Sequence, residues 1–510
     1  MAASLSSMNK KPYTMKYLIY ILSALLLSAG CGSENPQVDD AVGFSADKTV
    51  LEFSAEGGEQ TFTVTSADPF YVINDKSDWI SAVKGGKGKD NKTVVTISVL
   101  ENTMAVRRQA TVSVSNGHEK VNVDVIQNAK SEESGPLVQR LPHKLGIGWN
   151  LGNHFDAYNN GVSCETAWGN PLATQATFDK VRAAGFKTVR IPVTWMGHIG
   201  PAPDYKIEEA WLNRIAEVVG YAENAGLNAV VNIHHDGADS AHWLDIKTAA
   251  NDPAVHQQIL DQVTAMWKQI AVKFQDKGDF LIFEAFNEIH DGGWGWGDNK
   301  KDGGKQYQCL NEWNQAFVNA VRSSGGMNAE RMLAVPAYCT NVDIAIESFV
   351  MPEDSADDRM ILAVHCYDPY DYTLPANKSE WGHTANPSKK VAGDNEADLK
   401  KVFEKLHTNF ILKGVPVYMG EFGCVNRETE REQKFQQYYF RYYAKLSQIY
   451  GVPCMVWDNG AKGAGNEKHA FFDHGTGVYC SDGAKSAMQA LVDSYTNTLT
   501  LEETYNNAPK

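Results

Sequence analysis

The chain is short of positive charge. Its 510 residues carry 47 Lys and Arg against 62 Asp and Glu, which gives a formal net charge of −15 at pH 7. Nucleic acids bind basic faces, so we expect no nucleic-acid partner, and the same deficit disfavours polyanionic substrates. Neutral substrates are unaffected by it. The 43% hydrophobic and 21% charged content is ordinary for a globular protein, so extensive disorder is not expected.

Cysteines are few and lack the spacing of a metal site. None of the eight falls in a Cys-x-x-Cys pair or in the Cys and His spacing of a zinc site. Cys366, Cys424 and Cys454 lie in or beside apolar stretches, where a buried free thiol is the expected state. The glycines of 146–152 also miss the spacing of a dinucleotide loop, and no acid follows at the distance that such a site needs. We therefore expect no cofactor.

The N-terminus has the pattern of a targeting segment. Lys10, Lys11 and Lys16 precede the apolar stretch 17–27, which is too short to span a bilayer because a spanning helix takes about 20 apolar residues. Small residues follow and lead directly to Cys31. This arrangement resembles a bacterial lipoprotein signal covering 1–31, in which Cys31 is acylated; the alternative is a secretory signal with an incidental cysteine. We expect a monomeric lipoprotein at the bacterial cell surface, held to the outer membrane only by its lipid anchor.

Residues 37–128 have the pattern of a small all-β domain. Apolar and polar residues alternate in Val- and Thr-rich stretches, separated by turns that contain Gly, Asn and Asp: 49–53, 60–65, 93–99, 110–114 and 121–125. Alternation with period two places the apolar side chains on one face of each strand, and this spacing predicts an immunoglobulin-like β-sandwich. The polar segment 129–140 is expected to be a linker.

From residue 141 to 500 the pattern changes to apolar stretches that alternate with amphipathic helical patterns. Trp211, Ile215, Val218 and Ala222, for example, recur at the spacing of one helix face. Eight strand-then-helix units fit a (β/α)₈ TIM barrel better than an open doubly wound sheet. The candidate strands are 145–150, 188–192, 229–233, 280–286, 332–335, 361–364, 415–419 and 454–457.

Polar, titratable and aromatic residues gather at the expected carboxyl ends of these strands. In such a barrel those ends line one mouth, where the active site lies. The set comprises Asn150, Arg190, His234, His235, Asn287, Glu288, His365, Tyr367, Glu421 and Trp457. Glu288 and Glu421 each end an apolar stretch, where an ionisable acid is costly unless something satisfies it. Two facing carboxylates are what hydrolysis of a glycosidic bond needs; the alternative for either acid is a buried ion pair with a nearby Arg or His.

His234, His235 and Asp236 can also be interpreted as metal ligands. Adjacent residues on a strand point to opposite faces, so one strand is not expected to direct both histidines at a single ion. By the same reasoning only one of the two histidines should face a substrate directly, with the other turned toward the loop. We therefore expect no metal at this place.

Tryptophans offer flat apolar faces for sugar rings, although most aromatic residues simply pack in a core. Trp294 and Trp296 stand among glycines in the loop after Glu288, where they form either a sugar platform or a plug packed against the protein. The same two interpretations stay open for three further tryptophans: Trp168, Trp195 and Trp381. Trp294 and Trp296 are included among the expected substrate-binding residues.

The strand-end motifs, taken together, resemble those of glycoside hydrolase family 5. They occur in the expected order over 141–498: Val-Arg-Ile-Pro at 189–192, Ile-His-His-Asp at 233–236, Phe-Asn-Glu at 286–288, His-Cys-Tyr at 365–367, Gly-Glu-Phe-Gly at 420–423 and Val-Trp-Asp-Asn at 456–459. Segments 148–153 and 165–171 further resemble its subfamily 4 of endoglucanases and xyloglucanases. Family membership implies a retaining mechanism, with Glu288 as acid/base and Glu421 as nucleophile.

The resemblance also implies roles for neighbouring residues. Arg190 is expected to favour the ionised form of Glu421, and Asn287 is placed to bond the sugar 2-hydroxyl. Burial and the nearby negative charge are expected to raise the pKa of Glu288, so that it carries a proton near neutrality. His234 is the histidine that is expected to face the sugar. Trp457 is expected to offer the ring on which the sugar stacks. The other expected substrate-binding residues are Asn153, His235, His365 and Tyr367, the last of which would also hydrogen-bond Glu421.

The first domain resembles the bacterial module called BACON, in the segments 53–58, 79–80, 108–112 and 125–127. We expect it to be a spacer that holds the barrel away from the membrane, with sugar binding as the alternative. For the whole protein we expect a retaining endo-β-1,4-glucanase that hydrolyses plant cell-wall β-glucans, with xyloglucan favoured. The alternatives are an endo-β-mannanase or mixed-linkage glucanase of the same family, and a catalytically inactive glycan-binding protein at the cell surface.

Overall fold

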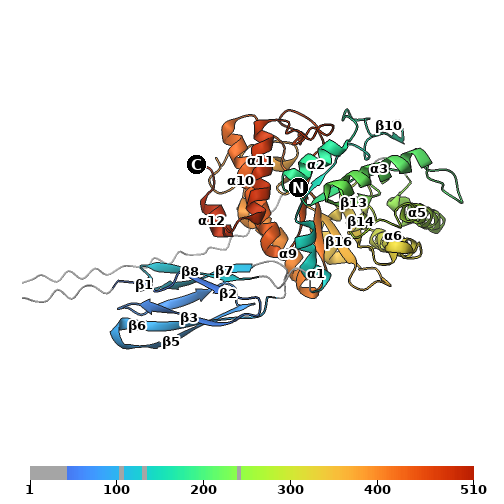
Figure 1. Ribbon diagram of the computed structural model, residues 1–510. Helices are drawn as coiled ribbons and strands as arrows, with labels where there is room; N and C mark the ends of the chain where they lie inside the picture. Colours follow the sequence, from blue (N-terminus) through green and yellow to red (C-terminus); the bar gives the residue numbers. More distant parts are fainter. Residues whose placement is uncertain (1–42, 103–107, 129–134, 238–242) are drawn as a thin grey trace, which may run out of the picture.

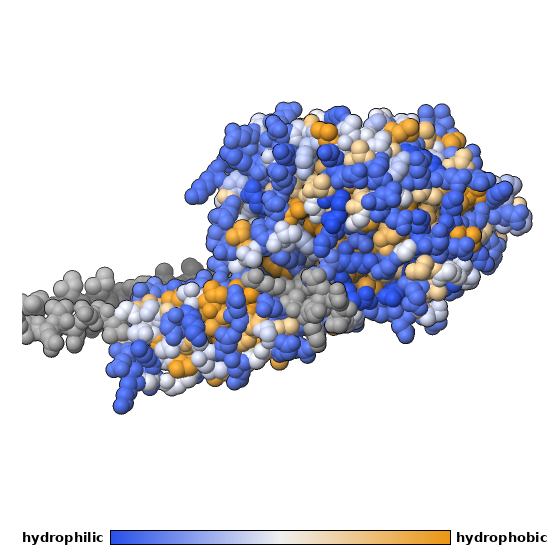
Figure 2. All heavy atoms as spheres, viewed as in Figure 1, coloured by the Kyte–Doolittle hydropathy of each residue, from blue (hydrophilic) through white to orange (hydrophobic). Residues whose placement is uncertain are grey.

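The computed structural model describes residues 43–102, 108–128, 135–237 and 243–510, which form a small β domain and a larger α/β domain (Figure 1). Cys31 and the expected signal lie outside the described residues, as does part of the expected linker. Polar residues cover most of the face in view (Figure 2). None of the helices within the described ranges is long and apolar enough to cross a membrane.

The N-terminal domain is a sandwich of two four-stranded sheets. One has the strand order β1 (Ser45–Ala46), β3 (Gly58–Thr65), β6 (Lys92–Val99), β5 (Ile80–Lys87), and the other β2 (Val50–Phe53), β8 (Lys120–Gln127), β7 (Arg108–Ser115), β4 (Tyr71–Asn74). Phe62, Trp79 and Val95 are buried in the core of this domain. The predicted sandwich is confirmed. The sequence pattern does not predict β1, β4 and β5, because buried and exposed residues do not alternate along them.

The larger domain is a closed barrel of eight parallel strands, as predicted. Around the barrel these are β9 (Ile147–Asn150), β12 (Thr188–Ile191), β13 (Asn228–Asn232), β14 (Leu281–Glu284), β15 (Leu333–Pro336), β16 (Met360–His365), β17 (Val417–Phe422) and β18 (Cys454–Val456), which pairs back with β9. All of their residues except Asn228 are buried. Burial on both faces explains why these strands have continuous apolar stretches rather than alternation.

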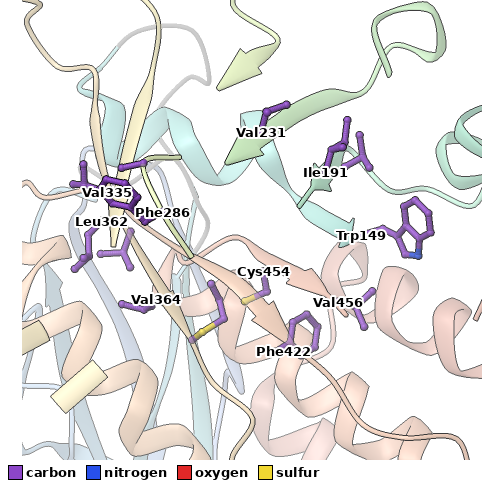
Figure 3. Packing of buried hydrophobic residues seen from close by; sticks show 14 of the residues in the cluster. Trp149, Ile191, Val231, Phe286, Val335, Leu362, Val364, Phe422, Cys454 and Val456 are labelled. Carbon is purple, nitrogen blue, oxygen red and sulfur yellow. The ribbon is translucent and has the colours of Figure 1, made fainter. Parts of the chain in front are cut away.

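Helices surround the barrel (Figure 1). The predicted stripe from Trp211 to Ala222 lies on α3 (Glu209–Ala225) and packs in the apolar layer between strands and helices. Trp149, Phe286 and Leu362 belong to the same apolar cluster (Figure 3). After the short hairpin β10 (Tyr158–Asn159) and β11 (Val162–Ser163), the helices are α2 (Gln175–Ala183), α3 (Glu209–Ala225), α4 (Ile246–Ala249), α5 (Pro253–Lys273), α6 (Lys305–Arg322), α7 (Val342–Ser348), α8 (Tyr370–Thr373), α9 (Asn395–Asn409), α10 (Glu430–Tyr450), α11 (Asp482–Thr496) and α12 (Leu501–Asn506).

The helix α1 (Leu137–Leu145) closes the amino-terminal end of the barrel. Leu137, Leu141 and Leu145 form one apolar cluster with barrel residues such as Ile282 and Met455. The helix therefore begins inside the segment that was expected to be a linker up to residue 140. Because α1 fills this end, the opposite, carboxyl end of the strands is left for a functional site.

Candidate active site

The two expected acids reach the carboxyl end of the barrel from different positions on their strands. Glu288 lies in the loop after β14, whereas Glu421 lies within β17, just before its last residue. The ladder between β16 and β17 shifts register beside His365, and the ladder between β17 and β18 shifts beside Glu421. Irregularities of this kind redirect side chains next to active sites. A carboxylate oxygen of Glu288, one of Glu421 and a ring nitrogen of His365 all lie within 4.8 Å of one another.

Glu421 is held by a cation and a hydroxyl. Arg190 Nη1 donates to Glu421 Oε1 over 2.7 Å, and the Tyr367 hydroxyl donates to Oε2 over 2.9 Å. Burial and the negative charges of Glu421 and Glu288 raise the pKa of Tyr367 well above its ordinary value, so its hydroxyl stays a donor. His234 Nε2 lies 4.0 Å from the same carboxylate. The expected contacts of Glu421 with Arg190 and Tyr367 are present.

Glu288 is in a different environment. His365 Nδ1 lies 2.7 Å from Glu288 Oε1 and 3.8 Å from Glu421 Oε2, so one imidazole contacts both acids. The side chain of Glu288 is 20% exposed, compared with 7% for Glu421. Of the two acids, Glu288 is therefore the more accessible to a group that enters the mouth.

The pKa of Glu288 differs from the expectation. Burial acts to raise it, but the hydrogen bond and charge of His365, followed by the charges of His290 and Arg190, bring it below its ordinary value. The expectation of a raised pKa is therefore wrong for the free protein. The reason is that His365 Nδ1 lies 2.7 Å from Glu288 Oε1, where a proton on Nδ1 is donated to the carboxylate and stabilises its ionised form.

Residues outside the expected set complete the support of Arg190. Glu284, the last residue of β14, accepts hydrogen bonds from Arg190, from Asn232 at the end of β13 and from Tyr418 in β17. Asn150 and Asn287 accept two further bonds from the same guanidinium. A polar residue at the end of an apolar strand was the available signal for Glu284 and Asn232. Tyr418 carried no such signal, because tyrosine is common in buried strands.

The two adjacent histidines lie close together, contrary to the expectation that they point to opposite faces. Their ring centroids are 4.4 Å apart, and His235 Nε2 lies 3.8 Å from Asp156 Oδ2. The strand rule does not apply because β13 ends at Asn232, so both histidines belong to the following loop. Burial, together with the charges of His235 and Arg190, lowers the pKa of His234 well below its ordinary value, which makes it a neutral ring beside Glu421. The absence of a metal stays a prediction.

Trp457 lies on the wall of the site. Its ring is nearly parallel to that of His234, with 6.1 Å between the centroids, and it is 8% exposed. A Cβ atom at residue 152 would lie 2.8 Å from this ring, so only glycine fits there. Asp458, which follows Trp457 in the chain, accepts hydrogen bonds from the Trp149 ring and from three backbone N–H groups, which fixes the segment that carries Trp457.

The other tryptophans separate into two classes. Trp294 and Trp296 are 53% and 84% exposed, so they are not a plug, and Trp168 is also exposed. Trp195 and Trp381 are fully buried and belong to the core. The exposed rings lie in two places: Trp294 and Trp296 in the loop after β14, and Trp168 against His235.

Asn153 has a role in the loop after β9. Its backbone is left-handed, with φ 56°, and its N–H donates to Asp156, the acid that lies beside His235. Its carbonyl accepts a bond from Asn170. None of its hydrogen bonds within the described ranges joins it to Glu288 or Glu421. Direct contact of its side chain with a substrate stays a prediction.

Two family models match the chain. The model for cellulases of glycosyl hydrolase family 5 matches residues 153–463, and the BACON model, described as a putative N-terminal binding domain, matches residues 70–128. The first covers every residue of the site from Asn153 to Trp457. The second covers the part of the sandwich from β4 to β8.

Individual relatives agree with these models. A solved broad-specificity GH5-4 endoglucanase from Bacteroides salanitronis is 53% identical, with a TM-score of 0.70 over 72% of this chain and 97% of its own. Endoglucanase A of Paenibacillus barcinonensis is 36% identical over 64% of this chain and 83% of its own length. A xyloglucan-specific endo-beta-1,4-glucanase of Bacteroides ovatus is 32% identical over 88% of this chain and 92% of its own, and so spans both domains. The chain is a glycoside hydrolase that belongs to glycoside hydrolase family 5, with a BACON domain ahead of its catalytic barrel.

Proposed function

We propose that the protein is a retaining endo-β-1,4-glucanase that hydrolyses plant cell-wall β-glucans, with xyloglucan as the favoured substrate. Endoglucanase activity on β-glucans is supported by relatives that carry this activity in their names. The observation that supports retention is that carboxylate oxygens of Glu288 and Glu421 approach within 4.8 Å. Retaining pairs lie about 5–5.5 Å apart, whereas inverting pairs lie about 6.5–9.5 Å apart to leave room for a water molecule.

In the first step Glu421 attacks the anomeric carbon and forms a glycosyl ester. The bond from this carbon to the leaving oxygen breaks, and the protonated form of Glu288 supplies a proton to that oxygen. In the second step Glu288 removes a proton from water as the water attacks the same carbon. The ester bond breaks and Glu421 leaves as a carboxylate, so the β-configuration is restored.

Neighbouring residues orient the nucleophile and the sugar. Arg190 and Tyr367 hold the two oxygens of Glu421 at 2.7 and 2.9 Å, which fixes the direction of its attack. The side-chain oxygen of Asn287 accepts a hydrogen bond from Arg190, so the amide nitrogen of Asn287 is the group available for the sugar 2-hydroxyl. His234 and Trp457 offer adjacent flat rings against which the pyranose can pack.

Replacing His365 with glutamine is expected to move the alkaline limb of the kcat/KM profile to higher pH. His365 lowers the pKa of Glu288, so its loss raises that pKa, and the acid keeps its proton to higher pH. The profile is measured on soluble β-glucan. His383→Gln is the matched control, because His383 also pairs with a glutamate, Glu396, away from the site. A limb that stays in place or moves to lower pH in His365→Gln contradicts this role.

Exposed aromatic residues support action within a long chain. Trp294 and Trp296 stand at one place on the mouth, and Trp168 with Tyr158 stands at another, beside His235. Sugar rings stacked at both places would bind several units of one glucan chain, which favours endo cleavage. The xyloglucan preference follows the Bacteroides ovatus relative, which is matched over both domains.

For location, we propose that Cys31 is lipidated and that the protein is exposed on the outer membrane as a monomer. The sandwich then acts as a spacer between membrane and barrel. Trp79, its one tryptophan, is buried in the domain core, which leaves no exposed tryptophan there for sugar stacking within the described residues.

The direct test combines products with a substrate panel. Proton NMR during hydrolysis is expected to show the β-anomer first, and xyloglucan is expected to be cleaved faster than mixed-linkage glucan, carboxymethyl-cellulose and glucomannan. An α-anomer as first product would exclude the two-step mechanism. A preference for glucomannan would favour a mannanase, and no hydrolysis of any substrate despite binding would favour a glycan-binding protein.

A further inference from the structure

A third carboxylate, that of Glu284, shares Arg190 with Glu421. Its side chain is 1% exposed, and it is the last residue of β14, the strand that leads to Glu288. Glu284 Oε1 lies 2.6 Å from Arg190 Nη2, and both of its oxygens also accept from Arg190 Nε. This is a two-pronged contact, the strongest form of an arginine–carboxylate pair.

The contacts of Arg190 account for all five of its N–H groups. Nε and one N–H of Nη2 bind Glu284, and the second N–H of Nη2 binds Asn287. Nη1 binds Asn150 and Glu421. The guanidinium thus makes a bidentate contact with Glu284 but donates only one hydrogen bond to Glu421.

Glu284 is itself held from two other strands. Tyr418 donates to Oε2 over 2.5 Å and Asn232 to Oε1 over 2.9 Å. Burial acts to raise the pKa of Glu284, but the charge of Arg190 outweighs it and lowers the pKa, so the carboxylate is ionised. Burial and the charge of Glu284 raise the pKa of Tyr418, which therefore remains a donor.

We propose that Glu284 is a positioning residue for the nucleophile, acting through Arg190. It fixes the plane of the guanidinium, limits Arg190 to a single bond with Glu421, and balances the charge of Arg190 when Glu421 loses its own. The inference rests on the two-step mechanism proposed above.

The charge balance matters most in the first chemical step. When Glu421 forms the ester, its negative charge is lost, while Arg190 stays charged and fully buried. An uncompensated buried cation is strongly destabilising. Glu284 supplies the compensation, so its neutralisation should raise the barrier to ester formation. The second step regenerates the charge on Glu421 beside Arg190, so loss of the Glu284 charge should not slow it.

The test is pre-steady-state hydrolysis of 2,4-dinitrophenyl β-cellobioside, whose good leaving group allows ester formation without an acid. Glu284→Gln is expected to slow the burst of dinitrophenol and to lower kcat/KM by about 100-fold, the order seen when one preorganised charge contact is removed. Because the second step is spared, kcat falls less and KM rises. Glu284→Asp keeps the charge with a poorer fit and is expected to show the same signature to a smaller degree. Glu396→Gln, a buried glutamate on α9, is the matched control and should behave as wild type.

The outcomes separate this inference from the proposed function. If wild-type protein gives no burst and no covalent adduct with a 2-fluoro cellobioside, the two-step mechanism itself fails. If wild type does both and a folded Glu284 variant matches its burst rate, only the role of Glu284 is overturned. Equal losses in kcat and burst amplitude with unchanged KM would indicate a merely structural residue. Where Glu284→Gln does not fold by circular dichroism, the Asp variant decides.

Discussion

Replacing Glu421 with glutamine is expected to lower kcat on β-glucan by about 10⁴-fold or more. An amide is not a nucleophile that can form the glycosyl ester, so the first step is lost. Glutamine has the same size and keeps an oxygen for Arg190 or Tyr367, which should preserve the shape of the mouth. Polysaccharide binding, measured by affinity electrophoresis or calorimetry, is therefore expected to survive.

A matched control for this substitution is Tyr367→Phe. It removes one hydrogen bond to Glu421 Oε2 but leaves the carboxylate in place. Loss of one such bond is expected to cost about tenfold in kcat/KM, far less than loss of the nucleophile. Near-normal hydrolysis by Glu421→Gln would remove Glu421 from the nucleophile role, whatever its ion pair with Arg190.

Replacing Glu288 with alanine is expected to lower hydrolysis of β-glucan by about 10³-fold, within the usual range for a general acid. The loss should depend on the leaving group. Sugar leaving groups need a proton, whereas dinitrophenolate does not, so ester formation from the activated substrate should continue and the ester should accumulate. Azide, a small anion that needs no general base, is expected to restore turnover and to give the β-glycosyl azide.

The control for Glu288 is Thr340→Val. The Thr340 hydroxyl lies 3.4 Å from Glu288 Oε1, so its loss perturbs the surroundings of the acid without removing it. Its rate should stay within a few-fold of wild type, and azide should not accelerate it. An α-azide product, or equal losses on natural and activated substrates in Glu288→Ala, would contradict the acid/base role.

The barrel and its two acids could be predicted because short stretches of the sequence indicate them. Strands buried on both faces have continuous apolar stretches, and Glu288 and Glu421 each follow or end such a stretch. The β-sandwich was predicted for the corresponding reason, the period-two alternation in strands such as β6. Its strands β1, β4 and β5 were not predicted, because side chains there lack a consistently buried face.

The pKa of Glu288 shows where pattern fails. The sequence places an acid beside an apolar strand, and desolvation alone raises the pKa of such an acid. The opposite direction in the folded protein comes from His365, a residue of a different strand whose ring reaches Glu288 at 2.7 Å. The distance between these two groups depends on the closure of the barrel and on the register shift beside His365.

The eight barrel strands, the family and the two acids at the strand ends thus follow from the sequence, because each is marked by short segments of the chain. Only the tertiary structure decides how the acids differ. Arg190, Glu284, Tyr418 and Glu421 come from three separate strands, and their shared hydrogen bonds exist only when the strands close into a barrel. The position of His234 beside His235 likewise depends on where β13 ends. Contacts between distant strands set charge, protonation and orientation, and no local pattern in the chain encodes them.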